Sequence, residues 1–273
     1  MNPIAVAVQF RFRLAAIAVS ATMTFGLAVA VEPGAIAELD ETFKSRGKDV
    51  IVDLYAPSAP GKYPAVIVLH GRNGVGEGKR SGSHQAAREL ARAGYVTLVP
   101  HYFGRNVPDP KNGRKNARSH AIWTRTVIDT VSFATRRDNV NPRQIGLLGI
   151  SNGSWVALSV AARDRRVRAV VEYYGGYPGW DEIDPARLPP VLILHGDADR
   201  VVPVNEADKL EAVLKEAGVP YDMHIYPGAD HGFRGADRED ALKRSLEFFA
   251  THVKREGPSA APRAARPDSA KSE

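Results

Sequence analysis

The sequence predicts an α/β fold in which one mostly parallel sheet is covered by helices on both faces. Short runs rich in β-branched residues alternate along the chain with longer helical stretches, as in repeated βα units. Most of these runs are apolar throughout, which is typical of strands buried on both faces. The 273 residues, 44% of them hydrophobic, are enough to bury one large core, so we expect one main domain.

The expected elements follow one another in a regular order. Gly94 and Gly218 follow two of the expected helices, at the place of a left-handed C-terminal cap. No internal repeat interrupts the order. Strands are expected at Val50–Tyr55, Ala65–His70, Val96–Pro100, Gln144–Gly149, Val167–Tyr173, Val191–His195 and Tyr221–Tyr226, and helices at Ser83–Ala93, Asn116–Arg137, Ser151–Ala162, Asn205–Ala217 and Arg238–Lys254.

An export signal is expected at residues 1–30. Arg11 and Arg13 precede an apolar run that ends in Ala-Val-Ala at 28–30, the small-x-small pattern that signal peptidase cleaves. We expect cleavage after Ala30, no stable membrane anchor in the mature protein, and a periplasmic or secreted location. An uncleaved anchor is the alternative, since the apolar run nearly reaches bilayer length, although serine, threonine and glycine residues weaken it as a span.

Composition narrows the classes of partner. The chain has no cysteine, which excludes a disulfide framework and a lipid-modified cysteine. Part of the formal net charge of +6 lies in the terminal segments, and no basic stripe is interleaved with aromatic residues, so no nucleic-acid partner is expected. Residues 31–256 are expected to form the main domain, and the polar, proline-rich residues 257–273 a disordered tail.

A candidate nucleophile lies in the pentapeptide Gly-Ile-Ser-Asn-Gly at residues 149–153. It follows an expected strand and opens an expected helix rich in alanine, valine and leucine, which is the context of a nucleophile elbow. A strained turn there lifts the serine hydroxyl above the sheet edge, and the flanking glycines let strand and helix approach. A strand-to-helix turn with a capping serine would contain the same string, but the surrounding elements favour Ser151 as a nucleophile.

A nucleophilic serine needs a base and a carboxylate that orients the base, and with an elbow these follow in the order serine, acid, histidine. His231 lies in a glycine-flanked loop after the last expected strand, and two aspartates follow the preceding strand. Asp197 directly follows a glycine and could simply form a turn. Asp199 is better placed to reach a neighbouring loop, so Asp199 is favoured.

The oxyanion of a tetrahedral intermediate needs backbone N–H donors, and the amide after the nucleophile belongs to Asn152. A second donor is expected from the loop His-Gly-Arg-Asn-Gly at residues 70–74, with Arg72 as first choice and Asn73 as second. The other histidines have no second ligand at metal-site spacing, so no metal site is expected.

The chain from about Asp49 to His252 resembles the dienelactone hydrolase family. The resemblance rests on the elbow at Ser151, the His-Gly-x-x-Asp-x-x-Val-Pro segment that carries Asp199, the His-Gly-Phe segment that carries His231, and the Pro-His-Tyr-Phe-Gly-Arg stretch at residues 100–105. It implies an α/β-hydrolase fold with a mostly parallel sheet of about eight strands, no cofactor, and hydrolysis of a small-molecule ester or lactone. The family pattern also favours Asp199 as the acid.

Two features depart from the family's lactonases. The founding enzymes use a cysteine nucleophile, whereas this chain offers Ser151. The lactonase also binds an acidic substrate through two arginines, of which only Arg105 has a counterpart here, since Arg234 lies at a different offset. The departures favour a broader serine carboxylesterase over a dienelactone-specific enzyme.

Tyr102 and Arg105 are the candidate substrate-binding residues. Other aromatic residues that could line the pocket or pack in the core are Phe103, Tyr177 and Trp180. A peptidase is a second possible function, because prolyl-oligopeptidase-type domains share the acid and elbow segments, but those proteins usually carry a propeller domain for which 273 residues leave no room. A binding protein without turnover is disfavoured, because the serine, acid and histidine are all present.

Overall fold

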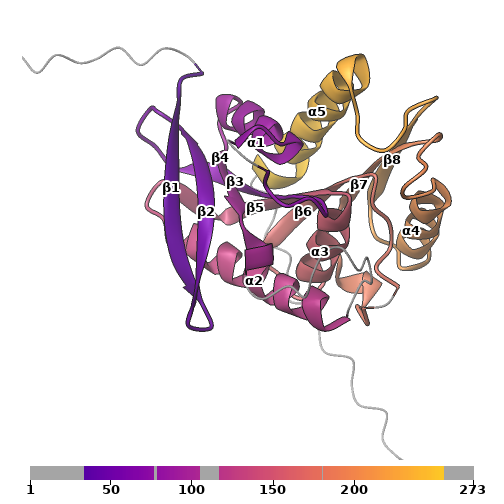
Figure 1. The fold of residues 1–273 in the computed structure, drawn as a ribbon, viewed down its shortest axis with the longest axis horizontal. Helices are drawn as coiled ribbons and strands as arrows, with labels where there is room; N and C mark the ends of the chain where they lie inside the picture. The colour runs from indigo at the N-terminus through magenta and orange to yellow at the C-terminus, as the bar shows by residue number, and fades with distance from the viewer. Residues whose placement is uncertain (1–33, 77–78, 105–116, 180, 255–273) are drawn as a thin grey trace, which may run out of the picture. The chain divides into compact units, whose positions relative to one another are not determined.

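One eight-stranded sheet forms the centre of the part of the computed structural model that is described, residues 34–76, 79–104, 117–179 and 181–254 (Figure 1). The strand order is β1-β2-β4-β3-β5-β6-β7-β8. β2 pairs antiparallel with β1 and with β4, and the other pairs are parallel. The predicted mostly parallel sheet of about eight strands is therefore confirmed.

The strands are β1 (Ile36–Ser45), β2 (Lys48–Pro57), β3 (Tyr63–Leu69), β4 (Val96–Pro100), β5 (Val140–Ile150), β6 (Val167–Tyr173), β7 (Val191–Gly196) and β8 (Tyr221–Tyr226). The helices are α1 (Gly82–Arg92), α2 (Ala117–Thr135), α3 (Asn152–Ala161), α4 (Asn205–Glu216) and α5 (Gly235–Phe249), and a π-helical turn over Ala250–Lys254 continues α5.

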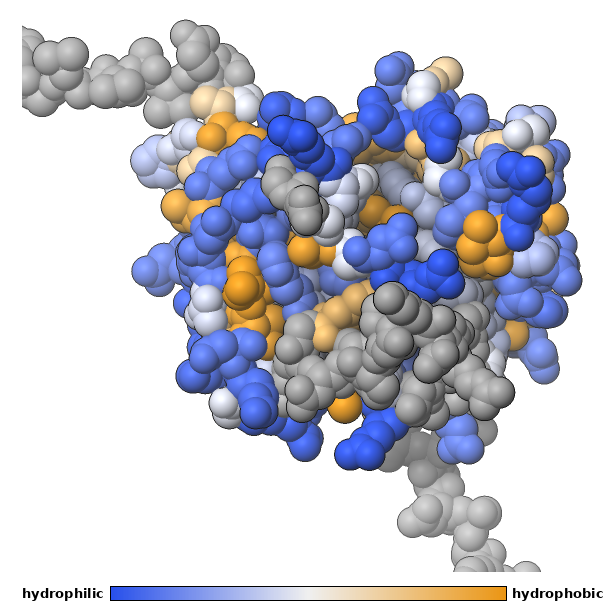
Figure 2. All heavy atoms as spheres, viewed as in Figure 1, coloured by the Kyte–Doolittle hydropathy of each residue, from blue (hydrophilic) through white to orange (hydrophobic). Residues whose placement is uncertain are grey.

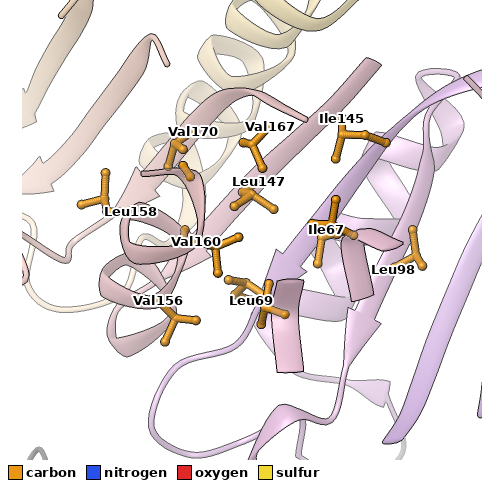
Figure 3. Packing of buried hydrophobic residues seen from close by; sticks show 14 of the residues in the cluster. Ile67, Leu69, Leu98, Ile145, Leu147, Val156, Leu158, Val160, Val167 and Val170 are labelled. Atoms are coloured by element: carbon orange, nitrogen blue, oxygen red, sulfur yellow. The ribbon is translucent and has the colours of Figure 1, made fainter. Parts of the chain in front are cut away.

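Helices cover both faces of the sheet. α1 and α5 contribute to an apolar cluster with Val66 and Val68 of β3, and α2, α3 and α4 contribute to a second cluster with Ile67 of the same strand (Figure 1). Figure 3 shows the second cluster, in which Ile67 and Leu147 of neighbouring strands lie on the same side as Val160 of α3. Because successive side chains of a strand point to opposite faces, a strand covered on both sides is apolar throughout.

β1 is the strand that the sequence does not predict. It lies at the edge of the sheet, and most of its side chains are exposed or half-buried, with Phe43 and Ser45 the buried ones. It therefore lacks the apolar run by which the inner strands are recognised. The turn into β2 holds the missed signal, since Arg46 and Gly47 both have positive φ, 47° and 77°, as in a type I′ hairpin turn. Arginine in place of the usual asparagine hides this signal.

The carboxyl ends of the parallel strands β3 to β8 meet at one edge of the sheet. The loops that follow β3, β5, β6, β7 and β8 therefore converge there, and ligands of open α/β sheets bind at this edge. Ser151, Asp199 and His231 each belong to one of these loops.

The face shown in Figure 2 is mostly hydrophilic, with apolar atoms in small separate patches. The large apolar side chains that are exposed in the described ranges are Leu39, Ile51 and Val201. No helix within those ranges is long and apolar enough to cross a bilayer. The expected signal peptide at 1–30 and the expected tail at 257–273 lie outside the described residues.

Candidate active site

Ser151 lies in a sharp turn between β5 and α3. Its backbone angles, φ 53° and ψ −119°, are unfavourable for a residue with a Cβ atom. Its N–H donates to the carbonyl oxygen of Tyr173 at the end of β6, over 2.8 Å. Strain of this kind persists only where the surroundings fix the residue, and it is the conformation that a nucleophile elbow requires.

Gly149 and Gly153 let three backbone segments meet at this turn. A Cβ atom on Gly149 would lie 2.5 Å from Cα of Ser154, and one on Gly153 would lie 2.4 Å from the carbonyl oxygen of Leu69. The obstructing atoms belong to backbone, which cannot move aside as a flexible side chain can. β5, α3 and β3 can therefore approach one another only because both positions lack a side chain.

His231 connects Ser151 to Asp199. Its Nε2 lies 2.9 Å from Oγ of Ser151, and its Nδ1 lies 2.7 Å from Oδ2 of Asp199. A carboxylate only accepts hydrogen bonds, so Nδ1 carries the imidazole proton and its N–H donates a hydrogen bond to Asp199. In the neutral imidazole, Nε2 is then left with a lone pair facing the serine hydroxyl.

The two aspartates of the loop after β7 have different partners. Asp199 is the one that reaches His231; its side chain is 0% exposed, and its second oxygen accepts from the N–H groups of Val201 and Val202, each over 2.8 Å. Asp197 instead accepts from the N–H of Gly228, over 2.6 Å. The geometry therefore separates an aspartate beside the histidine from one that joins two loops.

An ion pair that the sequence analysis misses ties the histidine loop to the acid loop. Oδ1 of Asp230 accepts from the N–H of His231 over 2.7 Å and from the N–H of Arg200 over 3.1 Å. The Arg200 guanidinium also binds Asp230 and holds the pKa of that carboxyl well below its usual range. Because the pairing joins residues thirty positions apart in two loops, spacing along the chain does not reveal it.

The two expected oxyanion donors belong to segments that adjoin Ser151. Asn152 is the first residue of α3, so its backbone N–H has no carbonyl partner within the helix. Arg72 follows Gly71, where an added Cβ would lie 3.4 Å from Cβ of Ser151, so the loop passes directly beside the serine. The N–H of Gly74 donates to the Gly71 carbonyl over 3.1 Å and closes this loop into a turn.

Tyr102 packs against His70, at the start of the loop that carries Arg72. Its side chain is 0% exposed, its ring stacks on His70 at 4.1 Å, and its hydroxyl donates to the carbonyl oxygen of His70 over 2.5 Å. A direct substrate contact at Tyr102, as expected above, has no support in this buried position. Phe103 packs edge-on against His70 and near Trp123. The other expected contact, Arg105, lies outside the described residues.

Tyr177 is half-buried and packs against the core, and Trp180 lies outside the described residues. Sequence reasoning misses a different aromatic residue, Tyr174. Its ring lies 4.8 Å from the His231 imidazole at an interplanar angle of 67°, and burial raises the pKa of its hydroxyl. The signal was its position directly after a buried strand, at the edge where the site forms.

Residues 50–253, most of the chain, match the dienelactone hydrolase family. The chain belongs to this family. A Synechocystis sp. protein provisionally named carboxymethylenebutenolidase is 28% identical over 231 residues, which cover 74% of this chain and 91% of the relative. The carboxymethylenebutenolidase of Rhodococcus opacus is 25% identical over 77% of this chain and 90% of its own length. The protein is therefore a hydrolase of the dienelactone hydrolase type.

Solved structures share the fold at lower identity. A provisionally named dienelactone hydrolase from Klebsiella pneumoniae has a TM-score of 0.68 at 23% identity, over 80% of this chain and 100% of that one. A dienelactone hydrolase-like promiscuous phosphotriesterase from metagenomic libraries has a TM-score of 0.70 at 17% identity, over 80% and 99%. The acylaminoacyl peptidase of Pyrococcus horikoshii has a TM-score of 0.67 at 18% identity, but the match covers 43% of that longer chain. These likenesses show the fold.

We expect His70 to make this dienelactone hydrolase family member sensitive to acid. Burial lowers the pKa of His70 to about 4, below the ordinary value of 6.5. Between these pH values His70 binds more protons in the unfolded chain than in the folded one. Its contribution to the free energy of unfolding is therefore fully present above pH 6.5 and is lost as the pH falls towards 4. In His70→Gln this loss should shrink by up to about 3 kcal/mol.

Denaturant unfolding at several pH values between 7 and about 4 would measure this loss. His195, whose pKa burial also lowers, contributes in the same direction in both proteins and so cancels in the comparison. Equal loss of unfolding free energy in the wild type and in His70→Gln would contradict the expectation.

Proposed function

We propose that this protein is an exported serine esterase that hydrolyses small carboxylic esters or lactones through Ser151, His231 and Asp199. The observation that carries the proposal is the continuous relay of 2.9 Å from Ser151 Oγ to His231 Nε2 and 2.7 Å from His231 Nδ1 to Asp199 Oδ2. The relay begins at a serine with the strained backbone of an elbow, and the Asp199 end of it is shielded from water.

In the proposed reaction Ser151 Oγ attacks the substrate carbonyl carbon while its proton passes to His231 Nε2. The resulting oxyanion accepts from the backbone N–H groups of Asn152 and Arg72. The carbon–oxygen bond to the alcohol portion then breaks, and that oxygen takes the proton from His231. Water, deprotonated by His231, attacks the acyl-serine, and the acid leaves as Ser151 regains its proton. Asp199 holds the imidazole and stabilises its protonated form throughout.

The substrate class rests on the relatives and on the nucleophile. The relatives described above carry the name carboxymethylenebutenolidase, provisionally in one case, and a butenolide is a cyclic ester. The serine in place of the cysteine of the family's founding enzymes, and an acid-binding arginine pattern matched at only one position, favour a broader range of small esters over that one lactone. A panel of aryl esters with increasing acyl length, run beside aminoacyl anilides, would separate an esterase from a peptidase.

Covalent labelling tests the nucleophile. A fluorophosphonate probe should label the wild type at Ser151, because the hydroxyl faces an imidazole lone pair, and Ser151→Ala should be neither labelled nor active on short-chain aryl esters. Ser58→Ala, which removes an exposed serine, is the matched control and should label as the wild type does. A wild type that neither labels nor turns over esters would refute the proposal and leave a binding protein.

The acid should be Asp199 and not Asp197. Asp199→Asn would present an amide to Nδ1 and favour the wrong tautomer, so kcat should fall by about 10³- to 10⁴-fold. Asp197→Asn keeps an oxygen that can accept from Gly228, so kcat should stay within about threefold of the wild type. Initial rates at pH 7.5 on one aryl ester would decide, and a larger loss in Asp197→Asn would contradict the assignment.

Export is supported by the pattern of residues 1–30. When the whole chain is expressed in a Gram-negative host, the periplasmic protein should begin at Val31, as read by N-terminal sequencing. Ala30→Arg should block this processing, because signal peptidase accepts only a small residue there. Full-length wild type in the membrane fraction would show that the segment is an uncleaved anchor.

A further inference from the structure

Glu172 is a buried carboxyl group with no part in the reaction proposed above. It lies in β6 opposite Gly149 of the elbow strand, and it is 0% exposed. Oε2 accepts from the backbone N–H of Gly175 over 2.8 Å, while Oε1 has no hydrogen-bond partner in the described part of the chain. Burial raises the pKa of the carboxyl to about 8, so the acid is mostly protonated at neutral pH. A buried, half-satisfied carboxyl is costly, which points to a role other than stability.

The carboxyl group lies at the base of the elbow. A Cβ atom on Gly175 would come within 2.7 Å of Glu172 Oε2 and 2.2 Å of Cβ of Ser154, the third residue after the nucleophile. The hydroxyl of Ser154 also lies against this carboxyl and hydrogen-bonds to the backbone next to it. The turn after β6 is therefore pressed against α3, and an apolar side chain at Glu172 would leave the N–H of Gly175 without its partner.

That turn carries Tyr174 to His231. Tyr174 has a positive φ of 41°, an unfavourable value for an aromatic residue. Its own N–H donates to the carbonyl oxygen of Leu194 over 2.8 Å, and the next N–H, of Gly175, is the one held by Glu172. The ring lies 4.8 Å from the imidazole of His231 and 4.9 Å from the ring of Phe233. The strained residue is thus held on both sides, so its ring has a fixed place against the histidine.

We propose that Glu172 is a positioning residue for turnover: by binding the N–H of Gly175 it fixes the turn that places the Tyr174 ring against His231, and so orients the imidazole towards Ser151. This inference rests on the proposed function, since it concerns the base of that reaction. The hydrogen bond that Glu172 accepts comes from Gly175 and not from Ser151, and in this proposal it acts on the rate only through Tyr174.

Two substitutions of similar size separate this role from packing. Glu172→Gln keeps an oxygen that accepts from Gly175 and mimics the neutral acid, so kcat should stay within about threefold of the wild type. Glu172→Met fills similar space without an acceptor and should lower kcat at least about tenfold while KM changes less than about threefold. Rates are divided by the number of active sites that a fluorophosphonate titrates, so unfolded protein does not count.

A control and a double mutant test the route through Tyr174. Thr97→Val removes another buried hydrogen bond, from Thr97 Oγ1 to the carbonyl oxygen of Ala87, and should lower the melting temperature without changing kcat. Tyr174→Ala should lower kcat as Glu172→Met does. Adding Glu172→Met to Tyr174→Ala should then lower kcat by less than about threefold relative to Tyr174→Ala alone, because the turn no longer carries the ring.

The outcomes separate this inference from the proposed function. If the wild type does not label at Ser151, the proposed function fails. If it labels, the inference is overturned by full kcat per titrated site in Glu172→Met, by equal losses in Glu172→Gln and Glu172→Met, or by independent losses in the double mutant. Should Glu172→Met not fold, an unchanged kcat in Tyr174→Ala overturns it.

Discussion

The close approach of β3, β5 and α3 around Ser151 is the constraint on which the rest of the structure depends. A backbone in the strained conformation of Ser151 costs about 1–3 kcal/mol and has to be held by its surroundings. α3, whose residues from Gly153 to Ala161 are all buried, and the apolar core between this helix and the sheet hold Ser151 in place. Since Gly153 rests on the carbonyl of Leu69, the same packing presses the elbow onto the start of the loop that carries Arg72.

A second set of contacts brings the acid and histidine loops together. The backbone N–H of Asp197 donates to the carbonyl oxygen of Tyr226 and that of Ala198 to the carbonyl oxygen of Ala229, so backbone hydrogen bonds join the two loops independently of any charged pair. Exposed ion pairs such as Arg200–Asp230 contribute little by themselves in water. Here the carboxylate of Asp230 also accepts two backbone N–H groups, which ties the ion pair to the loop geometry. The distance from Asp199 to His231 is therefore set mainly by backbone contacts.

The sequence predicts the inner strands and the loops of the site well, but it predicts the edge strand and the contacts between distant segments poorly. Inner strands such as β3 are apolar on both faces, and that pattern is visible in the sequence. β1 is missed because an edge strand buries few side chains. Ser151 and His231 stand out in the sequence because turn glycines flank them. The contacts of Tyr174 and Glu172 do not, because the Tyr174 ring meets His231 only once folding brings distant segments together. Tyr102 shows the reverse case, since an aromatic residue in a loop reads as a pocket residue until its burial is known.

In the proposed reaction, the serine makes the orientation of His231 more demanding than a cysteine nucleophile would. A thiol has a pKa near 8.5, and a neighbouring cation readily turns it into a nucleophilic thiolate before attack. A hydroxyl has no such state near neutral pH, so it loses its proton to a base as it attacks. The lone pair of Nε2 then has to face the hydroxyl at the moment of reaction.

The groups around the imidazole fit that requirement. Asp199 fixes which nitrogen carries the proton, Asp230 holds the backbone of the histidine, and Tyr174 limits where the ring can tilt. If His231 is the base of the proposed reaction, turnover at Ser151 depends on these neighbours of the imidazole, and changes among them should act on kcat before they act on substrate binding.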